Sequence, residues 1–343
     1  MNCTRIVIAL LISTINFMLL YQTISRKPHV QTMEFQSNMK TRRTNPPKTV
    51  SCFNGINVPE TINDSFVENT FSRWRTRDPN DHMLTIEPLG RLGNLMFQYA
   101  SLLGIALRNG KRPFIKPDNV LNTVFNLSFV ESWDTKQWLQ IAERQFASYS
   151  PEFEHLPAGN YVMGHYFQSW KYFQPIRKQI RKEFRFSGLY ERLRRNIFHL
   201  YTSPYKNRTV IALHVRRTDM MTPNNAGYTD ASVSYIYKAV QHMRDRFRNP
   251  VFLIATDDKA WCRQNLDSED MILMTTTNPF VDFGALILSD HMIMTVGTFG
   301  WWAAWLINGY TVYYKDYPTP GGMLEAKFTK EDYFMPHWIP MGG

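Results

Sequence analysis

The stretch T-V-I-A-L-H-V (Thr209–Val215) is an almost unbroken apolar run with the length of a buried strand. Similar runs recur further along the chain and alternate with segments in which apolar residues have helical spacing. The later strand-like runs are Val251–Thr256, Met292–Val296 and Thr311–Tyr314, and the helical segments are Asp230–Phe247, Phe280–Leu288 and Phe299–Asn308. Apolar strands that alternate with helices predict an α/β fold whose parallel sheet is covered on both faces.

A second set of elements precedes this region. Met83–Glu87 is a short apolar run, Pro88–Leu92 contains a glycine typical of a turn, and Gly93–Asn109 has helical apolar spacing. Arg112–Ile115 predicts the next strand, and the basic segment Ile176–Leu200 predicts one solvated amphipathic helix. We therefore expect two α/β halves, at residues 82–204 and 205–343.

The N-terminus contains a mostly apolar run, Ile6–Tyr21, between Arg5 and the pair Arg26 and Lys27. No small-x-small cleavage site follows the run, which favours an uncleaved signal anchor over a cleaved signal peptide. Positive charge is denser after the run and alone favours the opposite orientation, but long folded domains translocate largely regardless of charge. We expect a cytoplasmic tail at 1–5, a transmembrane helix at 6–22, a stem at 23–81 and a lumenal remainder.

The formal net charge of +10 suggests an anionic partner for the folded part of the chain. A lumenal location argues against nucleic acid and favours a phosphate-bearing nucleotide sugar. Three N-x-S/T sequons, at Asn63, Asn126 and Asn207, would then be glycosylation sites. The chain has three cysteines, too few for a disulfide framework; Cys52 and Cys262 either pair or remain free thiols.

Ligands of parallel sheets bind beyond the carboxyl ends of the strands, which makes three loops candidates: Arg216–Gly227, Asp257–Lys259 and Gly297–Phe299. Arg216 and Arg217 directly follow a strand, and a guanidinium offers a planar fork to phosphate oxygens. Asp219 could orient an arginine or act as a base. The structural alternative is an Arg–Asp pair at a strand end.

Two glycine-containing segments add to this pattern. Gly297-Thr298-Phe299-Gly300 opens a helix, where backbone N–H groups favour an anion, although a tight turn before a core helix would explain it equally. Gly90–Asn94 has two glycines around an arginine, which permits close backbone approach to a ligand. The chain has no D-x-D pair, so we expect arginine rather than a metal to stabilise a leaving diphosphate. Asp257 or Asp258 would contact a base or ribose instead.

Together these segments resemble the α-1,2-fucosyltransferases of glycosyltransferase family 11. The similar segments are G-R-L-G-N-L-M-F-Q-Y-A (Gly90–Ala100), G-H-Y-F-Q-S-W (Gly164–Trp170), H-V-R-R-T-D (His214–Asp219), A-W-C-R-Q-N (Ala260–Asn265) and the long stretch Asp282–Leu306. The resemblance implies a GT-B-like pair of Rossmann-like halves, with the acceptor at the first and GDP-fucose at the second. It also implies metal-free, inverting transfer of L-fucose to the 2-hydroxyl of a terminal galactose by a single-pass type II Golgi protein.

On this basis we expect a particular division of roles. Asp219, Arg216 and Asn94 are the candidate catalytic residues, with Asp219 as the base and Asn94 positioning acceptor or fucose. The candidate donor-binding residues are His214, Arg216, Arg217, Asp257, Gly297, Thr298 and Phe299. Two positions depart from the family pattern: Thr218 replaces a glycine, and Met220 stands where an aromatic residue is common. The alternatives are a protein O-fucosyltransferase and a catalytically inactive carbohydrate-binding relative.

Overall fold

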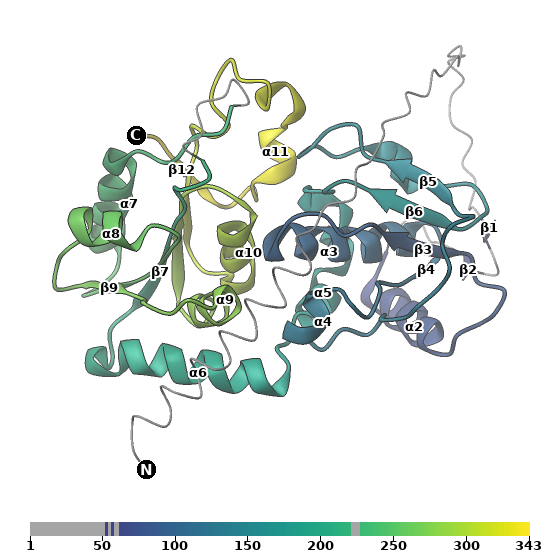
Figure 1. Ribbon diagram of the computed structural model, residues 1–343, viewed down its shortest axis with the longest axis horizontal. Coiled ribbons are helices and arrows are strands. Elements are labelled where there is room, and N and C mark those ends of the chain that lie inside the picture. Colours follow the sequence, from purple (N-terminus) through teal and green to yellow (C-terminus); the bar gives the residue numbers. More distant parts are fainter. Residues whose placement is uncertain (1–51, 54–55, 58–61, 221–226) are drawn as a thin grey trace. The chain divides into compact units, whose positions relative to one another are not determined.

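The computed structural model describes residues 52–53, 56–57, 62–220 and 227–343 (Figure 1). A six-stranded sheet in the second half has the order β12-β11-β10-β7-β8-β9, and every neighbouring pair is parallel. Its strands are β7 (Val210–Val215), β8 (Val251–Thr256), β9 (Met271–Leu273), β10 (His291–Met294), β11 (Thr311–Tyr314) and β12 (Ile339–Met341). The parallel sheet expected from the apolar runs is therefore present, with β9 and β12 added at its edges.

The first half contains a four-stranded sheet in the order β4-β3-β6-β5, which is also parallel throughout. Its strands are β3 (Met83–Ile86), β4 (Arg112–Pro113), β5 (Leu139–Ala142) and β6 (Tyr161–Gly164). A separate antiparallel pair, β1 (Cys52–Phe53) and β2 (Ile56–Asn57), precedes it. Helix α3 (Leu92–Arg108) follows β3 as its apolar spacing predicts, and short α4 (Leu121–Val124) follows β4.

Alternating side chains of the six-stranded sheet enter two different hydrophobic clusters. Ile211 and Leu213 of β7 pack with α7 (Val233–Arg246), whereas Ala212 packs with α9 (Pro279–Leu286) and α10 (Thr298–Ile307). Figure 1 accordingly shows α7 and α8 (Lys259–Asn265) on one side of β7, and α9 and α10 on the other. Both faces are covered, which explains why the strands lack polar alternation.

The segment Ile176–Leu200 forms two helices instead of the single one predicted. Helix α5 (Arg177–Glu183) ends at Phe184, and α6 (Gly188–Thr202) begins after Ser187. Between them Phe186 pairs with Phe125 in an isolated bridge, and the Ser187 N–H donates to the Val124 carbonyl at 2.8 Å. Tertiary contacts therefore interrupt a helical pattern that is continuous in the sequence.

The two halves do not pack as separate units, although the sequence suggests a boundary near residue 204. Helix α6 lies before that boundary but packs against α9 of the second half. Residues near the C-terminus return to the first half through α11 (Lys330–Tyr333): the Asp332 carboxylate accepts from the Tyr149 N–H at 2.7 Å and from Lys171 Nζ at 2.5 Å. The described residues accordingly form one compact unit.

The folded domain begins before residue 82, so the predicted stem is too long at its C-terminal end. Helix α2 (Asp64–Arg75) starts at Asn63, whose side chain accepts from the Phe66 N–H at 2.9 Å. Its Phe71 and Trp74 are buried and contact Phe129. The tail, the expected membrane helix and most of the stem lie outside the described residues.

No helix within the described residues is long and apolar enough to cross a membrane. Cys262, on α8, is a buried free thiol, which agrees with the unpaired alternative for this residue. The side chains of Asn63, Asn126 and Asn207 are exposed, as their use as glycan acceptors would require.

We predict that Trp74→Ala destabilises the domain, because it empties a fully buried site in contact with Phe71 and Phe129. The expected loss of unfolding free energy is about 3–5 kcal/mol. Denaturant unfolding of Trp74→Ala and of the exposed neighbour Arg75→Ala measures it. Equal stability of the two variants would mean that α2 belongs to a stem after all.

Candidate functional site

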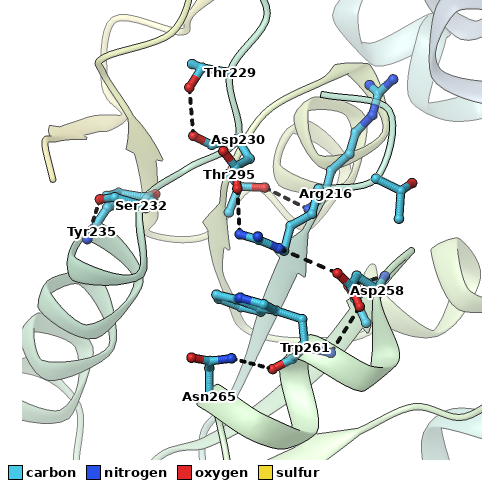
Figure 2. A network of polar contacts seen from close by, with 12 residues as sticks. Arg216, Thr229, Asp230, Ser232, Tyr235, Asp258, Trp261, Asn265 and Thr295 are labelled. Carbon is cyan, nitrogen blue, oxygen red and sulfur yellow. Dashed lines mark hydrogen bonds and ion pairs between the residues drawn. The ribbon is translucent and has the colours of Figure 1, made fainter. Parts of the chain in front are cut away.

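Two adjacent arginines at the carboxyl end of β7 enter different environments. In Figure 2 the Arg216 side chain extends away from Asp258 and Trp261. The Arg217 guanidinium does the reverse: its Cζ atom lies 4.1 Å from the centre of the Trp261 ring, and its Nη1 donates to Asp230 at 2.5 Å. The sequence suggested that both arginines hold one diphosphate, but in the structure the two side chains do not form a single clamp.

Arg216 makes a bidentate pair with Asp219. Its Nε and Nη2 atoms donate to the two carboxylate oxygens at 2.9 and 2.7 Å. Arg91, from the first half of the chain, donates to the same carboxylate. Two guanidinium groups around one carboxylate leave one positive charge uncompensated, which suits a further anion.

The pKa of Asp219 is lowered to about 2, chiefly by the hydrogen bonds from Arg216 and also by the charge of Arg91. This carboxylate is ionised at neutral pH and is a weak base. Of the two roles considered for Asp219, the geometry favours orienting Arg216 and Arg91 over accepting the acceptor's proton.

The loop after β7 is tied to the loop after β8 by Asp257. The Asp257 carboxylate accepts from the backbone N–H groups of Arg217 and Thr218, at 2.9 and 3.2 Å. It also accepts from the Thr218 hydroxyl at 2.7 Å. Thr218, which departs from the family pattern, thus adds a side-chain hydrogen bond between the two loops. Both carboxylate oxygens of Asp257 already accept hydrogen bonds from the β7 loop, so this residue supports the loop and is not placed primarily to bind a nucleotide.

Met220, the other departure, is buried in the hydrophobic cluster on the α7 side of the sheet. Its side chain packs in the core, so it does not face a ligand. The segments 221–226, which complete the first candidate loop, lie outside the described residues.

Gly297 allows Arg216 to reach its position. Gly297 has a φ of +92°, and a Cβ atom added there would lie 2.2 Å from Arg216 Nη1. Backbone hydrogen bonding fixes the other end of Arg216, whose N–H donates to the Thr295 hydroxyl at 3.1 Å. The turn after β10 and the arginine after β7 therefore form one unit.

The amino ends of α3 and α10 meet beside this unit. A Cβ atom added at Gly93 would lie 2.5 Å from the Thr298 carbonyl carbon and 2.7 Å from the Phe299 nitrogen, so only glycine permits the contact. Each helix amino end carries a partial positive charge. Together with Arg91 and Arg216, these ends make the region strongly attractive to an anion.

Asn94 connects the two halves at the same point. Its side-chain oxygen accepts from the Thr298 hydroxyl at 2.8 Å and from Gln168 Nε2 at 3.1 Å. Its amide nitrogen makes no hydrogen bond to any residue that the structure describes. The structure therefore brings Asn94, Thr298, Gly297, Arg216 and Asp219 together.

His214 is buried behind the site, against Phe299 and Gly300 of α10. Its ring stacks on Phe299 with centroids 5.1 Å apart, and burial followed by the charge of Arg216 lowers its pKa to about 4. The imidazole is therefore neutral at pH 7 and packs against the face of the Phe299 ring. Like Asp257, it supports the predicted site more than it lines it.

Sequence reasoning missed several contributors to this region. Arg91 lies in the turn Gly90–Asn94, and its position between two glycines is the sequence signal that points to it; the structure gives Gly90 a positive φ. Tyr317 is buried, and burial raises its pKa. Smaller effects come from Tyr228 and Asp219, which raise the pKa further, and from Arg216, which lowers it. No sequence spacing connects Tyr317 to Arg216.

No group of three or more His, Cys, Asp or Glu side chains within residues 62–220 and 227–343 is placed to hold a metal ion. Two of the residues expected to bind the nucleotide sugar have other partners: Arg217 donates to Asp230, and Asp257 accepts from the backbone of the β7 loop.

Known proteins resemble this chain over most of its length. Residues 58–341 match the model of glycosyl transferase family 11. The chain is 34% identical over 276 residues to galactoside alpha-(1,2)-fucosyltransferase 1 of Rattus norvegicus, covering 74% of this chain and 72% of the relative. It is 32% identical over 293 residues to galactoside alpha-(1,2)-fucosyltransferase 2 of the same organism, covering 79% and 82%.

A solved structure of an Arabidopsis thaliana FUT1 mutant in complex with GDP has a similar fold. The likeness covers 77% of this chain and 80% of that one, with a TM-score of 0.51 and 11% sequence identity. At this identity the likeness concerns the fold alone, and it agrees with the expected GT-B-like arrangement of parallel α/β sheets.

We predict that Gly297→Ala weakens affinity for GDP, the leaving group that the motifs suggest, by at least about tenfold, the equivalent of roughly 1.4 kcal/mol. The added Cβ would displace Arg216 Nη1. Gly321→Ala is the matched control, because Gly321 also has a positive φ but no atom lies within 4 Å of its would-be Cβ. Equal losses of affinity in calorimetry would attribute the effect to backbone strain alone.

We also predict a pH-dependent effect of His214. An unfolded histidine titrates near pH 6.5, whereas the pKa of folded His214 is about 4. Its contribution to stability is therefore fully present above pH 6.5 and is lost as the pH falls towards 4. Burial also raises the pKa of Glu143 to about 8 and that of Asp282 to about 7, so these groups titrate as well. Comparing thermal midpoints of the wild type and His214→Gln across this pH range isolates the contribution of His214. Parallel curves for the two proteins would contradict it.

Proposed function

The chain belongs to glycosyltransferase family 11, and on that premise we propose that it transfers L-fucose from GDP-fucose to the 2-hydroxyl of a terminal galactose. The product is an α-1,2 linkage, and the enzyme is a galactoside 2-α-L-fucosyltransferase. One observation in the site carries this proposal furthest. Arg216 and Arg91 converge on Asp219 where the amino ends of two helices meet.

The chemistry of the reaction matches that arrangement. The acceptor oxygen forms a bond to the anomeric carbon of fucose while the bond between that carbon and the diphosphate oxygen breaks. Because the acceptor attacks from the face opposite the diphosphate, the configuration of the anomeric carbon is inverted. The hydroxyl proton leaves to a base, and negative charge develops on the departing GDP. Arg216, supported by Gly297 and Thr298, and Arg91 supply fixed positive charge where that diphosphate would lie.

We propose that these arginines, rather than a metal ion, neutralise the leaving group. Arg217 is proposed to support the donor site indirectly, because Asp230, Asp258 and Trp261 already hold its guanidinium. Asn94, whose amide nitrogen is free of described partners, is proposed to contact the acceptor or fucose.

We further propose that the enzyme is a single-pass type II protein of the Golgi membrane with a lumenal catalytic domain and no nucleic-acid partner. The apolar run Ile6–Tyr21 and the exposure of the three sequon asparagines support this location. Glycosidase-sensitive glycans on Asn63, Asn126 or Asn207 in secretory-pathway protein would test it.

The activity is tested by measuring GDP release from GDP-fucose with and without a β-galactoside acceptor, followed by linkage analysis of the product. Acceptor-dependent release and a fucosyl-α-1,2-galactose product are expected. Fucose on a Ser or Thr hydroxyl would instead indicate a protein O-fucosyltransferase. Binding without acceptor-dependent turnover would indicate an inactive carbohydrate-binding relative.

We predict that Asp219→Asn mainly raises KM for GDP-fucose, because it releases Arg216 and Arg91 from their shared partner. Losing hydrogen bonds to charged groups costs about 1.5–3 kcal/mol, or roughly a ten- to hundredfold change. A base would behave differently: its loss would lower kcat and abolish the fall in kcat at low pH that protonation of a base produces. Arg216 and Arg217 provide a matched comparison. Arg216→Lys should raise KM for GDP-fucose more than Arg217→Lys does, because of the two only Arg216 pairs with Asp219.

A further inference from the structure

A pocket lies at the end of α10 opposite the Arg216 site. It has a volume of about 550 Å³, within the range of small-molecule sites, and it reaches Trp305 and Asn308 at the carboxyl end of the helix. Helix α10 has ten residues and therefore spans roughly 15 Å from Thr298. The pocket is thus separate from the proposed transfer site.

Three tryptophans line this pocket and are held in place by other contacts. Trp338 is buried and packs against Trp301 with ring centroids 5.3 Å apart. The Trp170 indole N–H donates to the Glu331 carbonyl at 3.2 Å, and Trp305 is covered by the Arg181 guanidinium at 4.5 Å. Trp170 is the partly exposed ring of the three, so it is the one that a ligand can reach, and a fixed aromatic ring offers apolar surface at little entropic cost.

The charged residues that line the pocket are all cationic: Arg177, Lys178 and Arg181, with His337 beside them. Arg181 donates to the carbonyls of Trp305 and Leu306 at the end of α10, and Lys178 pairs with Asp64. The Arg177 side chain is exposed and makes neither a hydrogen bond nor an ion pair with any described residue, although its charge acts on the Asp64 carboxylate that pairs with Lys178. Its planar fork is therefore available for a carboxylate.

A second pocket of about 410 Å³ adjoins the first and shares Gln174, Arg177 and Lys178 with it. Arg177 thus lies where the two pockets meet. The second pocket is also lined by the Asp64 carboxylate and by the sequon residue Asn63, so an acidic sugar is placed in the first pocket. The concave shape favours a discrete molecule over a flat surface, and the lining combines stacking rings with an unpaired cation.

We propose that this pocket is a second carbohydrate-binding site, which takes a sugar bearing a carboxylate, such as a sialic or uronic acid. The acid pairs with Arg177 while the sugar ring packs against Trp170, which the buried Trp305 and Trp338 adjoin in the pocket wall. This site is independent of the transfer reaction and would hold an acidic branch of a glycan remote from the fucosylated galactose.

The probe for this site is the methyl α-glycoside of N-acetylneuraminic acid, which contains no galactose and so is not an acceptor of the proposed reaction. Saturation-transfer NMR with the full chain is expected to show binding. The methyl ester of the same glycoside has nearly the same shape without the charge, and it should bind at least tenfold more weakly.

Matched variants locate the binding. Arg177→Glu should weaken it at least tenfold, whereas Arg248→Glu, at another exposed arginine, should not change it. Trp170→Leu should weaken it and Trp133→Leu, at an exposed tryptophan outside the pocket, should not. Thermal midpoints of all four variants confirm that each is folded, and Arg216→Lys should retain binding.

Several results would overturn the proposal. The wild type could fail to bind the glycoside, the ester could bind equally well, or Arg248→Glu could lose as much affinity as Arg177→Glu. Preference for a sulfated sugar or for inorganic phosphate would show a general anion site instead. Because the probe is not an acceptor, failure here leaves the transfer activity unaffected, and loss of activity leaves this binding measurable.

Discussion

The contact between Gly93 of α3 and the Thr298–Phe299 backbone of α10 is the constraint on which the site depends. No side chain separates the two helices there, so their amino ends meet backbone to backbone between the two halves. The Asn94 side chain then reaches Thr298, and Arg91 reaches Asp219. A larger residue at position 93 would separate the helices and would move the Asn94–Thr298 and Arg91–Asp219 contacts together.

The same contact creates an electrostatic cost. Two helix amino ends and two arginines lie close together, and like charges repel. Asp219 offsets part of that repulsion and keeps Arg216 and Arg91 extended. A diphosphate would offset the rest, so the protein pre-organises positive charge for a ligand that arrives with negative charge. The two neighbouring arginines differ because Arg217 is already neutralised by Asp230 and Asp258.

The sequence predicted the regular part of this molecule and much less of its site. Strand runs such as Val251–Thr256 match β8 in full, because buried parallel strands have a composition that few other elements share. Helix α2 was hidden in a polar region, although Asn63, Val67, Phe71 and Trp74 have the spacing of a capped amphipathic helix. The loop positions of the site followed from the rule for parallel sheets.

Side-chain partnerships could not be predicted in the same way. Arg91 and Asp219 lie 128 residues apart, and nothing local to either residue indicates the other. The opposite directions of Arg216 and Arg217 depend on Gly297 and Trp261, which lie further along the chain, before α10 and within α8. Local patterns therefore indicated which loops matter, while long-range packing determined which atoms meet.

The free thiol on α8 has a consequence for redox chemistry. Burial raises the pKa of Cys262 to about 11, so only about one molecule in ten thousand carries the thiolate at pH 7. Thiolate is the species that attacks disulfides and is oxidised by peroxide, and this sulfur is also shielded from solvent. Cys262 is thus chemically quiet, and the folded domain can meet an oxidising solution without forming mixed disulfides at this position.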